Sequence, residues 1–336
     1  MVSQQLRTDT KSAPHAQKTL GQGLGRIFRQ RESGIAIVAV LLIIVFQLLN
    51  NSFLSLANLK VVFQLSAEIA IVAVAEVMVM VLGEIDLSVG NVFAFSPFIM
   101  YFAYQAGMPL ILAVVAGLVA ALAVGLVNGL LHVKLKVPSF IATLATLYAV
   151  KGLTLVISNG YPVTTPGSGW LTGLLGASPW AIVWWAVIVA AVWHFLLKHN
   201  KFGIYTIAVG SNAVGSREVG IPTDRIRMVN FVLAALLGGL VGIVESFHVQ
   251  SIDPLAGGTS ILLQGIAAAV IGGTALTGGS GTIVGAVIGS IVIASLNDGM
   301  NLLGVNAYLF DVVLGIAIGI AMILNIRMMG VRGGRQ

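Results

Sequence analysis

Acidic side chains inside or beside long apolar stretches are the groups in this sequence most able to do chemistry. An isolated charge in hydrocarbon costs roughly 2.5–3.5 kcal/mol or more, so each of these carboxylates should face a cavity, a partner or the membrane interface. Glu68 and Glu76 lie eight residues apart, roughly on one face of a helix, which would suit a proton path. The full set is Glu68, Glu76, Glu84, Asp86, Glu245, Asp298 and Asp311.

Two polar interruptions, at residues 83–90 and 272–281, divide apolar segments with glycine and small polar residues. Flexible backbone and polar groups at such points are typical of broken helices beside a solute path. An ordinary tight turn on the cytoplasmic side is the alternative, and Asp86 could equally cap the helix that follows it. The candidates for contact with a solute are Glu84, Asp86, Ser88, Asn91, Gln264 and Thr274.

Enzyme chemistry has no support in the sequence. There is no cysteine, which excludes disulfides and thiolate chemistry, and the five histidines are scattered. The nucleophile elbow Gly-x-Ser-x-Gly is absent, and no Gly-Lys pair completes a phosphate-binding loop. We therefore expect no catalytic residues, no cofactor and no metal site.

The elements that must position the acidic residues are membrane-spanning helices. Of the 336 residues, 57% are hydrophobic and only 9% are charged, and the mean hydropathy is +0.99. We predict an all-α, polytopic helical membrane protein with about ten transmembrane helices. The expected spans are residues 34–53, 59–82, 90–104, 110–131, 138–157, 179–197, 228–247, 260–274, 282–296 and 308–325. The eighth and ninth are short enough to be broken or re-entrant.

Charge placement predicts the orientation of these spans. With a cytoplasmic N-terminus, almost all lysines and arginines outside the spans fall on the cytoplasmic side, and only Lys60 and Lys151 do not. Both termini should then be cytoplasmic. Residues 159–178 become the main outer loop, flanked by Trp170 and Trp180 at interface depth. The net charge of +6 follows this topology, so we expect membrane lipid and no nucleic acid as a partner.

Three regions follow from this organisation. Residues 1–32 are polar and basic, and we expect a disordered cytoplasmic tail. Residues 33–326 form the transmembrane domain, and residues 327–336 form a short basic cytoplasmic tail.

Residues 198–227 are the longest charged interruption of the apolar chain. Ser211 and Asn212 can cap a short helix, Gly220 would end it, and Pro222 would keep it from continuing. Such a capped helix between spans could be held by another protein, or it could be a solvated loop.

Three motifs resemble signatures of one family. They are Glu-Ile-Asp-Leu-Ser-Val-Gly at 84–90, Pro-Ser-Phe-Ile-Ala-Thr-Leu at 138–144, and Ile-Ala-Ala-Ala-Val-Ile-Gly-Gly-Thr-Ala-Leu-Thr-Gly-Gly at 266–279. From about residue 53 to residue 325 the chain resembles permease subunits of bacterial ABC sugar importers of the ribose/xylose type. The resemblance implies a location in the bacterial inner membrane and a monosaccharide or small polyol as cargo. It also implies three protein partners, namely an ABC ATPase, a second permease subunit (the same chain or a paralogue) and a periplasmic solute-binding protein.

The resemblance gives residues 198–227 a role as the cytoplasmic segment that couples the permease to the ATPase. Its candidate coupling residues are Gly210, Ser211, Asn212, Arg217, Glu218, Gly220, Ile221 and Arg225. The chain departs from the family pattern at Glu84, where glycine is usual, and at Leu262 and Gln264, where acidic residues are common. Gly215-Ser216 also replaces a common Ala-Ala pair.

Two alternative functions stay open at this point. One is a proton-coupled secondary transporter in which Glu68 and Glu76 relay protons. The other is an ABC permease for another small polar solute, such as a nucleoside, an autoinducer-type sugar or an amino acid.

Overall fold

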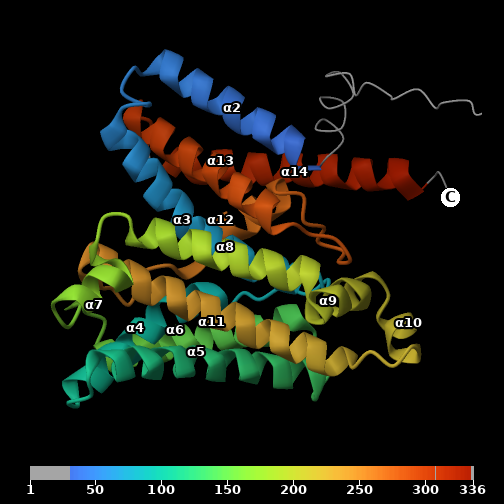
Figure 1. The fold of residues 1–336 in the computed structure, drawn as a ribbon, viewed down its shortest axis with the longest axis horizontal. Coiled ribbons are helices and arrows are strands. Elements are labelled where there is room, and N and C mark those ends of the chain that lie inside the picture. Colours follow the sequence, from blue (N-terminus) through green and yellow to red (C-terminus); the bar gives the residue numbers. More distant parts are fainter. Residues whose placement is uncertain (1–30, 307, 334–336) are drawn as a thin grey trace, which may run out of the picture.

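The protein is a bundle of long helices in a computed structural model that describes residues 31–306 and 308–333 (Figure 1). Across these residues the regular structure is helical except for one short antiparallel pair, β1 (Val163–Thr164) with β2 (Ser251–Ile252). The all-α prediction is confirmed. Of the tail predicted at residues 1–32, residues 1–30 lie outside the described residues.

Each expected span corresponds to a helix. These helices are α2 (Arg31–Leu49), α3 (Leu56–Met80), α4 (Val89–Gln105), α5 (Leu110–Val133), α6 (Ser139–Ser158), α8 (Ala181–His199), α11 (Thr223–Val249), α12 (Gly258–Ile271), α13 (Ile283–Leu302) and α14 (Tyr308–Gly333). Among the described helices, α3, α5, α6, α8, α11 and α13 are long and apolar enough to cross a membrane. The chain is therefore a multi-pass membrane protein, and the number of ten crossings stays a prediction. Helix α14 continues to Gly333, beyond the start of the tail predicted from residue 327.

The two spans expected to be short behave differently. Helix α12 has 14 residues and is about 21 Å long, less than the roughly 30 Å of a hydrocarbon core. Helix α13 has 20 residues, so the prediction of a short ninth span is wrong. Helix α13 continues past residue 296 to Leu302 and includes Asp298, whose carboxylate accepts a hydrogen bond of 2.7 Å from Asn58 of α3.

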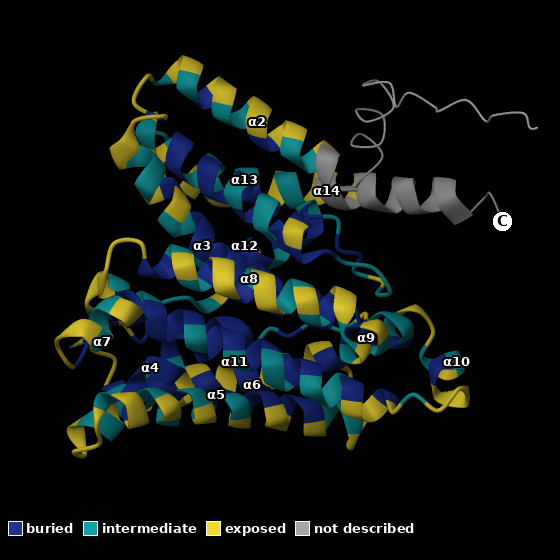
Figure 2. Cartoon of the chain, in the orientation of Figure 1, coloured by how far each residue is buried: buried dark blue, intermediate teal, exposed yellow. Residues whose placement is uncertain are grey.

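Helix α3 forms the centre of the bundle. Its C-terminal half is completely buried, and it packs against α8, α11, α12 and α13. Figure 2 shows buried residues in the middle of the molecule and exposed ones along the outer faces of α2, α5 and α8. The exposed side chains there include Leu48, Val119 and Trp184, as a lipid-facing surface requires. Helix α3 therefore holds these four helices together.

Residues 198–227 contain more helix than predicted. Asn200 caps α9 (Lys201–Ser211) through a hydrogen bond of 3.0 Å from the Phe202 N–H. Asn212 caps α10 (Ala213–Glu218) as predicted, accepting from the Gly215 N–H at 2.9 Å. The prediction that Ser211 also caps this helix is wrong. Ser211 is the last residue of α9, and its hydroxyl donates to the Ile207 carbonyl within α9.

The turn after α10 agrees with the predicted helix stop. Gly220 has a φ of +84°, a conformation that favours glycine. Pro222 ends this turn, and α11 begins directly after it at Thr223, five residues earlier than the predicted span. Helix α10 is thus a short projection between α9 and α11 (Figure 1).

Residues 159–178 lie at the opposite end of the bundle from α9 and α10 (Figure 1). They hold β1, the short helix α7 (Trp170–Thr172) and a π-helical turn (Gly173–Ala177). The β1–β2 pairing joins this loop to the segment after α11, and the Thr165 hydroxyl donates to the Ser246 carbonyl at 2.6 Å. The predicted outer loop is therefore an ordered cover over one end of the helices.

Candidate functional site

The two polar interruptions meet at one junction at the end of α9. The Gly279 N–H donates to the Val81 carbonyl at 2.8 Å, which joins the turn after α12 to the turn after α3. Gly210 of α9 packs against both turns, and a Cβ added there would collide with the Val81 carbonyl oxygen. Gly278, with a φ of +84°, lies beside the backbone of Gly210 and Gly83. The two polar interruptions are therefore connected, because the turns at which they begin and end both contact the last residues of α9.

Glu84 lies in an ionic cluster in the turn after α3. Its carboxylate is 3.0 Å from the Nε2 of His132 at the end of α5 and 3.6 Å from the Nε of Arg227 near the start of α11. Burial by itself raises the pKa of Glu84, but the interactions with His132 and Ser139 and the charges of His132 and Arg227 outweigh it. The pKa of Glu84 therefore lies below its ordinary value, and the carboxylate is held as an anion that connects three elements.

Asp86 and Ser88 belong to a buried hydrogen-bond network. The Asp86 carboxylate accepts from the Ser88 N–H at 2.9 Å and from the Ser88 hydroxyl at 2.7 Å. The Asn128 amide of α5 donates to Asp86 at 3.3 Å and to Ser88 at 2.8 Å. Thr146 of α6 donates to Asn128 at 2.6 Å. Asp86 therefore fixes the turn before α4 against α5 and α6 rather than capping α4, whose first residue is Val89.

The other three pathway candidates lie in different elements. Asn91 is buried in α4, and its amide donates to the Leu147 carbonyl of α6 at 3.0 Å. Gln264 is buried in α12, and its amide donates to the Ser260 hydroxyl at 3.1 Å. Thr274 is buried in the turn after α12, close to Gly281. The structure thus brings Asp86 and Ser88 together, and the other candidates have separate local contacts.

Glu68 and Glu76 occupy different surroundings although both belong to α3. Glu76 is fully buried, and neither carboxyl oxygen makes a well-formed hydrogen bond within the described chain, although it interacts with the backbone and charge of Asp86. Glu68 instead lines a cavity of about 280 Å³ together with Glu245 and Asp253. The six pathway candidates do not line this cavity. Glu245 carried a sequence signal as an acid within a span, whereas nothing in the sequence singled out Asp253.

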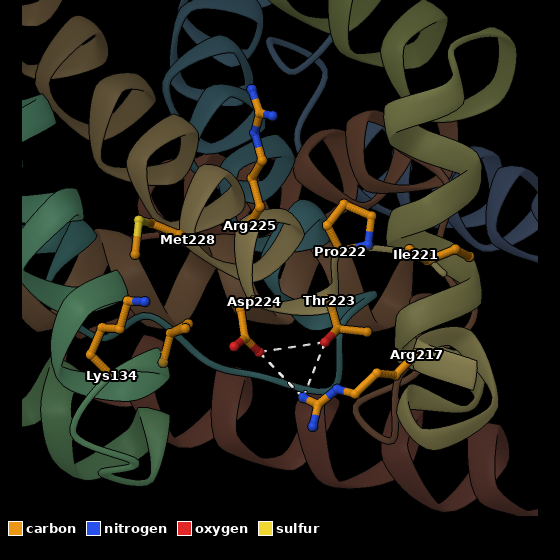
Figure 3. A pocket seen from close by; sticks show the side chains of 9 residues that line it. Lys134, Arg217, Ile221, Pro222, Thr223, Asp224, Arg225 and Met228 are labelled. Carbon is orange, nitrogen blue, oxygen red and sulfur yellow. Dashed lines mark hydrogen bonds and ion pairs between the residues drawn. The ribbon is translucent and has the colours of Figure 1, made fainter. Parts of the chain in front are cut away.

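An open cleft of about 550 Å³ lies beside α10 (Figure 3). Lys134 at the end of α5 and Arg217 lie on either side of Asp224 in this cleft, whereas the side chain of Arg225, which also lines it, extends away from them. The Arg217 guanidinium donates to the Thr223 hydroxyl at 3.2 Å and to the Asp224 carboxylate at 3.3 Å. The remaining residues that line the cleft are Val133, Ile221, Pro222, Thr223 and Met228. Basic groups and apolar carbon at one open surface are suited to contact with another protein.

The coupling candidates divide into two groups. Arg217, Ile221 and Arg225 line the cleft, and Glu218 and Gly220 are exposed beside it. Gly210 and Ser211 touch the glycine-rich junction instead, since both lie against Gly279. Asn212 separates the two groups as the cap of α10. One short segment therefore connects an open surface with the turns inside the bundle.

Comparison with known proteins decides the family. The family model described as "Branched-chain amino acid transport system / permease component" matches residues 58–322. The chain belongs to this permease family.

Similar permeases cover nearly the whole chain. The xylose/arabinose import permease of Sulfolobus acidocaldarius is 40% identical over 307 residues, covering 89% of this chain and 86% of the relative. The ribose import permease of Bacillus subtilis is 37% identical over 290 residues (85% and 89%), and that of Escherichia coli K12 is 34% identical over 296 residues (86% and 92%). No solved structure matches the chain. The resemblance to ribose/xylose-type permeases is confirmed, and the permease signatures at 84–90 and 266–279 are the segments that lead into the junction.

Proposed function

We propose that this permease is the transmembrane subunit of an ATP-driven ABC importer and forms the pathway for a monosaccharide or small polyol. Relatives of nearly equal length are named as import permeases for xylose, arabinose and ribose, which supports a sugar as the cargo. A periplasmic binding protein delivers the solute, and a separate ABC ATPase supplies the energy.

The junction of α9 with the two signature turns is the observation that carries the coupling part of the proposal. An ATPase bound at α10 and the basic cleft would move α9, because α9 and α10 are joined through the single cap residue Asn212. Gly210 has no free space against Val81, so a shift of α9 displaces the turns after α3 and α12. Tightly packed elements move as units in such transitions. Binding of the ATPase would thereby change the positions of the helices that surround the pathway.

The proposed orientation places α9, α10 and both termini in the cytoplasm and residues 159–178 outside, in a bacterial inner membrane. Lys134, Arg217 and Arg225 line one cleft, so basic residues from separate loops gather at a single end of the molecule. The importer further contains a second permease subunit, either the same chain or a paralogue.

Transport in proteoliposomes that contain the permease, its ATPase and its binding protein tests the energy source. We expect uptake of the sugar to require hydrolysable ATP and to survive collapse of the proton gradient. Uptake driven by a pH gradient without the ATPase would contradict the proposal and favour a secondary transporter. Mass spectrometry of the solute that co-purifies with the binding protein identifies the cargo, and a nucleoside or amino acid there would contradict a sugar.

Arg217→Glu tests the docking surface in the assembled importer. Because the substitution reverses a charge that lines the cleft, we expect about a tenfold loss of ATPase association in a pull-down from membranes, as is common for a residue in a polar contact. Lys198→Glu is the matched control, since Lys198 is exposed at the same end but does not line the cleft. Equal association of both variants would contradict docking at this surface.

A further inference from the structure

The cavity of about 280 Å³ that contains Glu68 and Glu245 lies toward the end of the molecule that carries the β1–β2 pair. Ile252 fixes this location, because it pairs with Val163 of the outer loop and also lines the cavity. The lining comes from α3, α4, α11 and the segment between α11 and α12. Its members are Glu68, Phe93, Ala94, Pro97, Gly242, Glu245, Ser246, Val249, Ser251, Ile252, Asp253, Ala256 and Gly257.

Close backbone packing around Phe93 closes the inner end of this cavity. Gly242 of α11 has no room for a side chain, because a Cβ there would collide with the Phe93 carbonyl oxygen. A Cβ at Gly257 would lie 2.7 Å from the Phe93 ring and 2.8 Å from the Gly90 carbonyl oxygen. The cavity is therefore open toward the exposed Asp253 and closed toward the junction.

Helix α12 begins at this closed end. Residues 253–257 lead from β2 to Gly258, where α12 starts, and α12 is too short to cross the hydrocarbon core by itself. Irregular backbone at membrane depth occurs where it lines a cavity, and the start of a discontinuous helix is a frequent place for a transported solute. The cavity thus combines the re-entrant segment with carboxylates from two long helices.

The two carboxylates have no partner within the described chain that explains their position. Both Glu68 and Glu245 line the cavity, and neither takes part in a hydrogen bond or ion pair among the described residues. Two of the other polar side chains at the cavity are engaged within the chain, since Ser246 donates to the Ile243 carbonyl and Asp253 accepts from the Leu255 N–H. Two carboxyl groups of membrane helices therefore face this cavity without a hydrogen-bond partner among the described residues.

A small polyhydroxy solute supplies hydrogen-bond partners for these two carboxyl groups. Adjacent hydroxyl groups are donors for carboxylate oxygens, and the C–H face of a sugar ring can pack on Phe93 and Pro97. The volume is near the lower limit of the roughly 300–1,000 Å³ of small-molecule sites, which suits a monosaccharide better than a larger solute. We infer that this cavity is a sugar-binding station on the outer side of the permease, in which Glu68 and Glu245 accept hydrogen bonds from hydroxyls of the solute. This inference rests on the proposed import function and names the residues that select its cargo.

Substitution of each carboxylate in the complete importer tests the assignment. For Glu68→Gln and Glu245→Gln we expect the KM for ATP-dependent uptake of radiolabelled D-ribose or D-xylose to rise at least tenfold, while the maximal rate and ATPase association stay within twofold. The control is Asp298→Asn, which removes a carboxylate of α13 that lies outside the cavity and is bound by Asn58. Its KM should not change.

A second measurement tests occupancy directly and does not depend on the two glutamates. The chain contains no cysteine, so Ala256→Cys places a single thiol at the cavity wall. We expect ribose or xylose to slow its reaction with N-ethylmaleimide at least fivefold, and to leave Ser178→Cys, an exposed site at the same end, unaffected.

The outcomes separate this inference from the function on which it rests. Normal sugar uptake with an unchanged KM in both glutamine variants would overturn the inference alone, as would labelling of Ala256→Cys that Na⁺ slows and sugar does not. Absence of ATP-driven sugar uptake by the unaltered importer would overturn the proposed function and this inference together.

Discussion

Glu84 opposes two basic side chains in the turn where related permeases were expected to carry glycine. His132 and Arg227 come from the ends of α5 and α11, so the Glu84 carboxylate holds two long helices to the turn after α3. A glycine there would leave Arg227, which is largely buried, without a counter-charge. The acidic substitution is thus explained by a local ionic cluster and does not require a solute.

Glu84→Gln should destabilise the permease because it leaves the Arg227 charge unopposed. An uncompensated group in a partly buried cluster costs about 1–3 kcal/mol, so we expect a lower Tm in detergent. The matched control is Asp224→Asn. It breaks an ion pair with Arg217 in which the side chains are 68% and 59% exposed, and such pairs contribute about 0–1 kcal/mol. Equal Tm changes in both variants would contradict a stabilising role for the cluster.

Acidification provides a second check on Glu84. Because the pKa of Glu84 is lower in the folded protein than its ordinary value of 4.5, the unfolded chain binds more protons in that pH range. The stabilisation is complete above pH 4.5 and is lost as the pH falls through the lower folded-state pKa. We expect the Tm difference between the unaltered protein and Glu84→Gln to shrink below pH 4.5. If this Tm difference stayed constant or grew on acidification, it would have to come from an interaction other than the ionised Glu84 carboxylate.

At the scale of elements, α9 is the part that connects the surface to the interior. It packs on α8 and α11, and Asn230 of α11 donates to the Thr206 hydroxyl of α9 at 3.2 Å. Its inner end is Gly210, which lies against the turns after α3 and α12. We interpret α9 as a rigid lever, because Val209 is buried in an apolar cluster with Phe202 packed against it, and Gly210 lies directly on the neighbouring backbone, which leaves little room for independent motion.

Gly210→Ala should separate docking from transport. The added methyl group collides with the Val81 carbonyl and must displace α9 or the turn, whereas the cleft beside α10 is left intact. We expect ATPase association within twofold of normal and at least a fivefold loss of ATP-driven uptake, because misplacement of the connecting element impairs the conformational step. Gly152→Ala in α6 is the control, since its added methyl group meets no atom within 4 Å. Unimpaired uptake by Gly210→Ala would argue against the lever.

At the scale of the whole molecule, the two ends of the bundle differ in chemistry. One end carries α9, α10, the basic cleft and the junction, and the other carries α7 and the β1–β2 pair (Figure 1). The Glu68–Glu245 cavity opens toward the second end and closes at Phe93. A solute from outside would therefore meet the cavity before the buried Asp86 network, as alternating access requires.

Single cysteines can establish the orientation because the natural chain has none. In intact cells, a membrane-impermeant maleimide should label Ser178→Cys, in the outer loop, at once. It should label Glu218→Cys, on α10, only after permeabilisation, because the basic end faces the cytoplasm. The reverse labelling pattern would invert the proposed topology and place the docking cleft outside.

Local patterns in the sequence determined the class, the approximate helix positions and the family of this protein. Hydropathy over about 20 residues is a local quantity, since lipid fixes the length of each apolar segment. Helix α9 escaped detection because its residues Ile204, Tyr205, Thr206 and Ile207 have weak helix propensity, and burial against α8 and α11 stabilises it instead.

Only the tertiary structure decided which polar side chains are satisfied and which are free to meet a solute. Asp86 and Asn128 are 42 residues apart, and the still more distant Arg227 lies beside Glu84. Glu68 shares a cavity with Glu245 and not with Glu76, although Glu68 and Glu76 lie roughly on one face of α3. The packing of α3 against α11 brings Glu68 and Glu245 together. Such pairings depend on which helices touch. The sequence therefore identified the acidic residues. Helix packing determined which of them connect neighbouring elements, as Glu84 and Asp86 do, and which line a cavity, as Glu68 and Glu245 do.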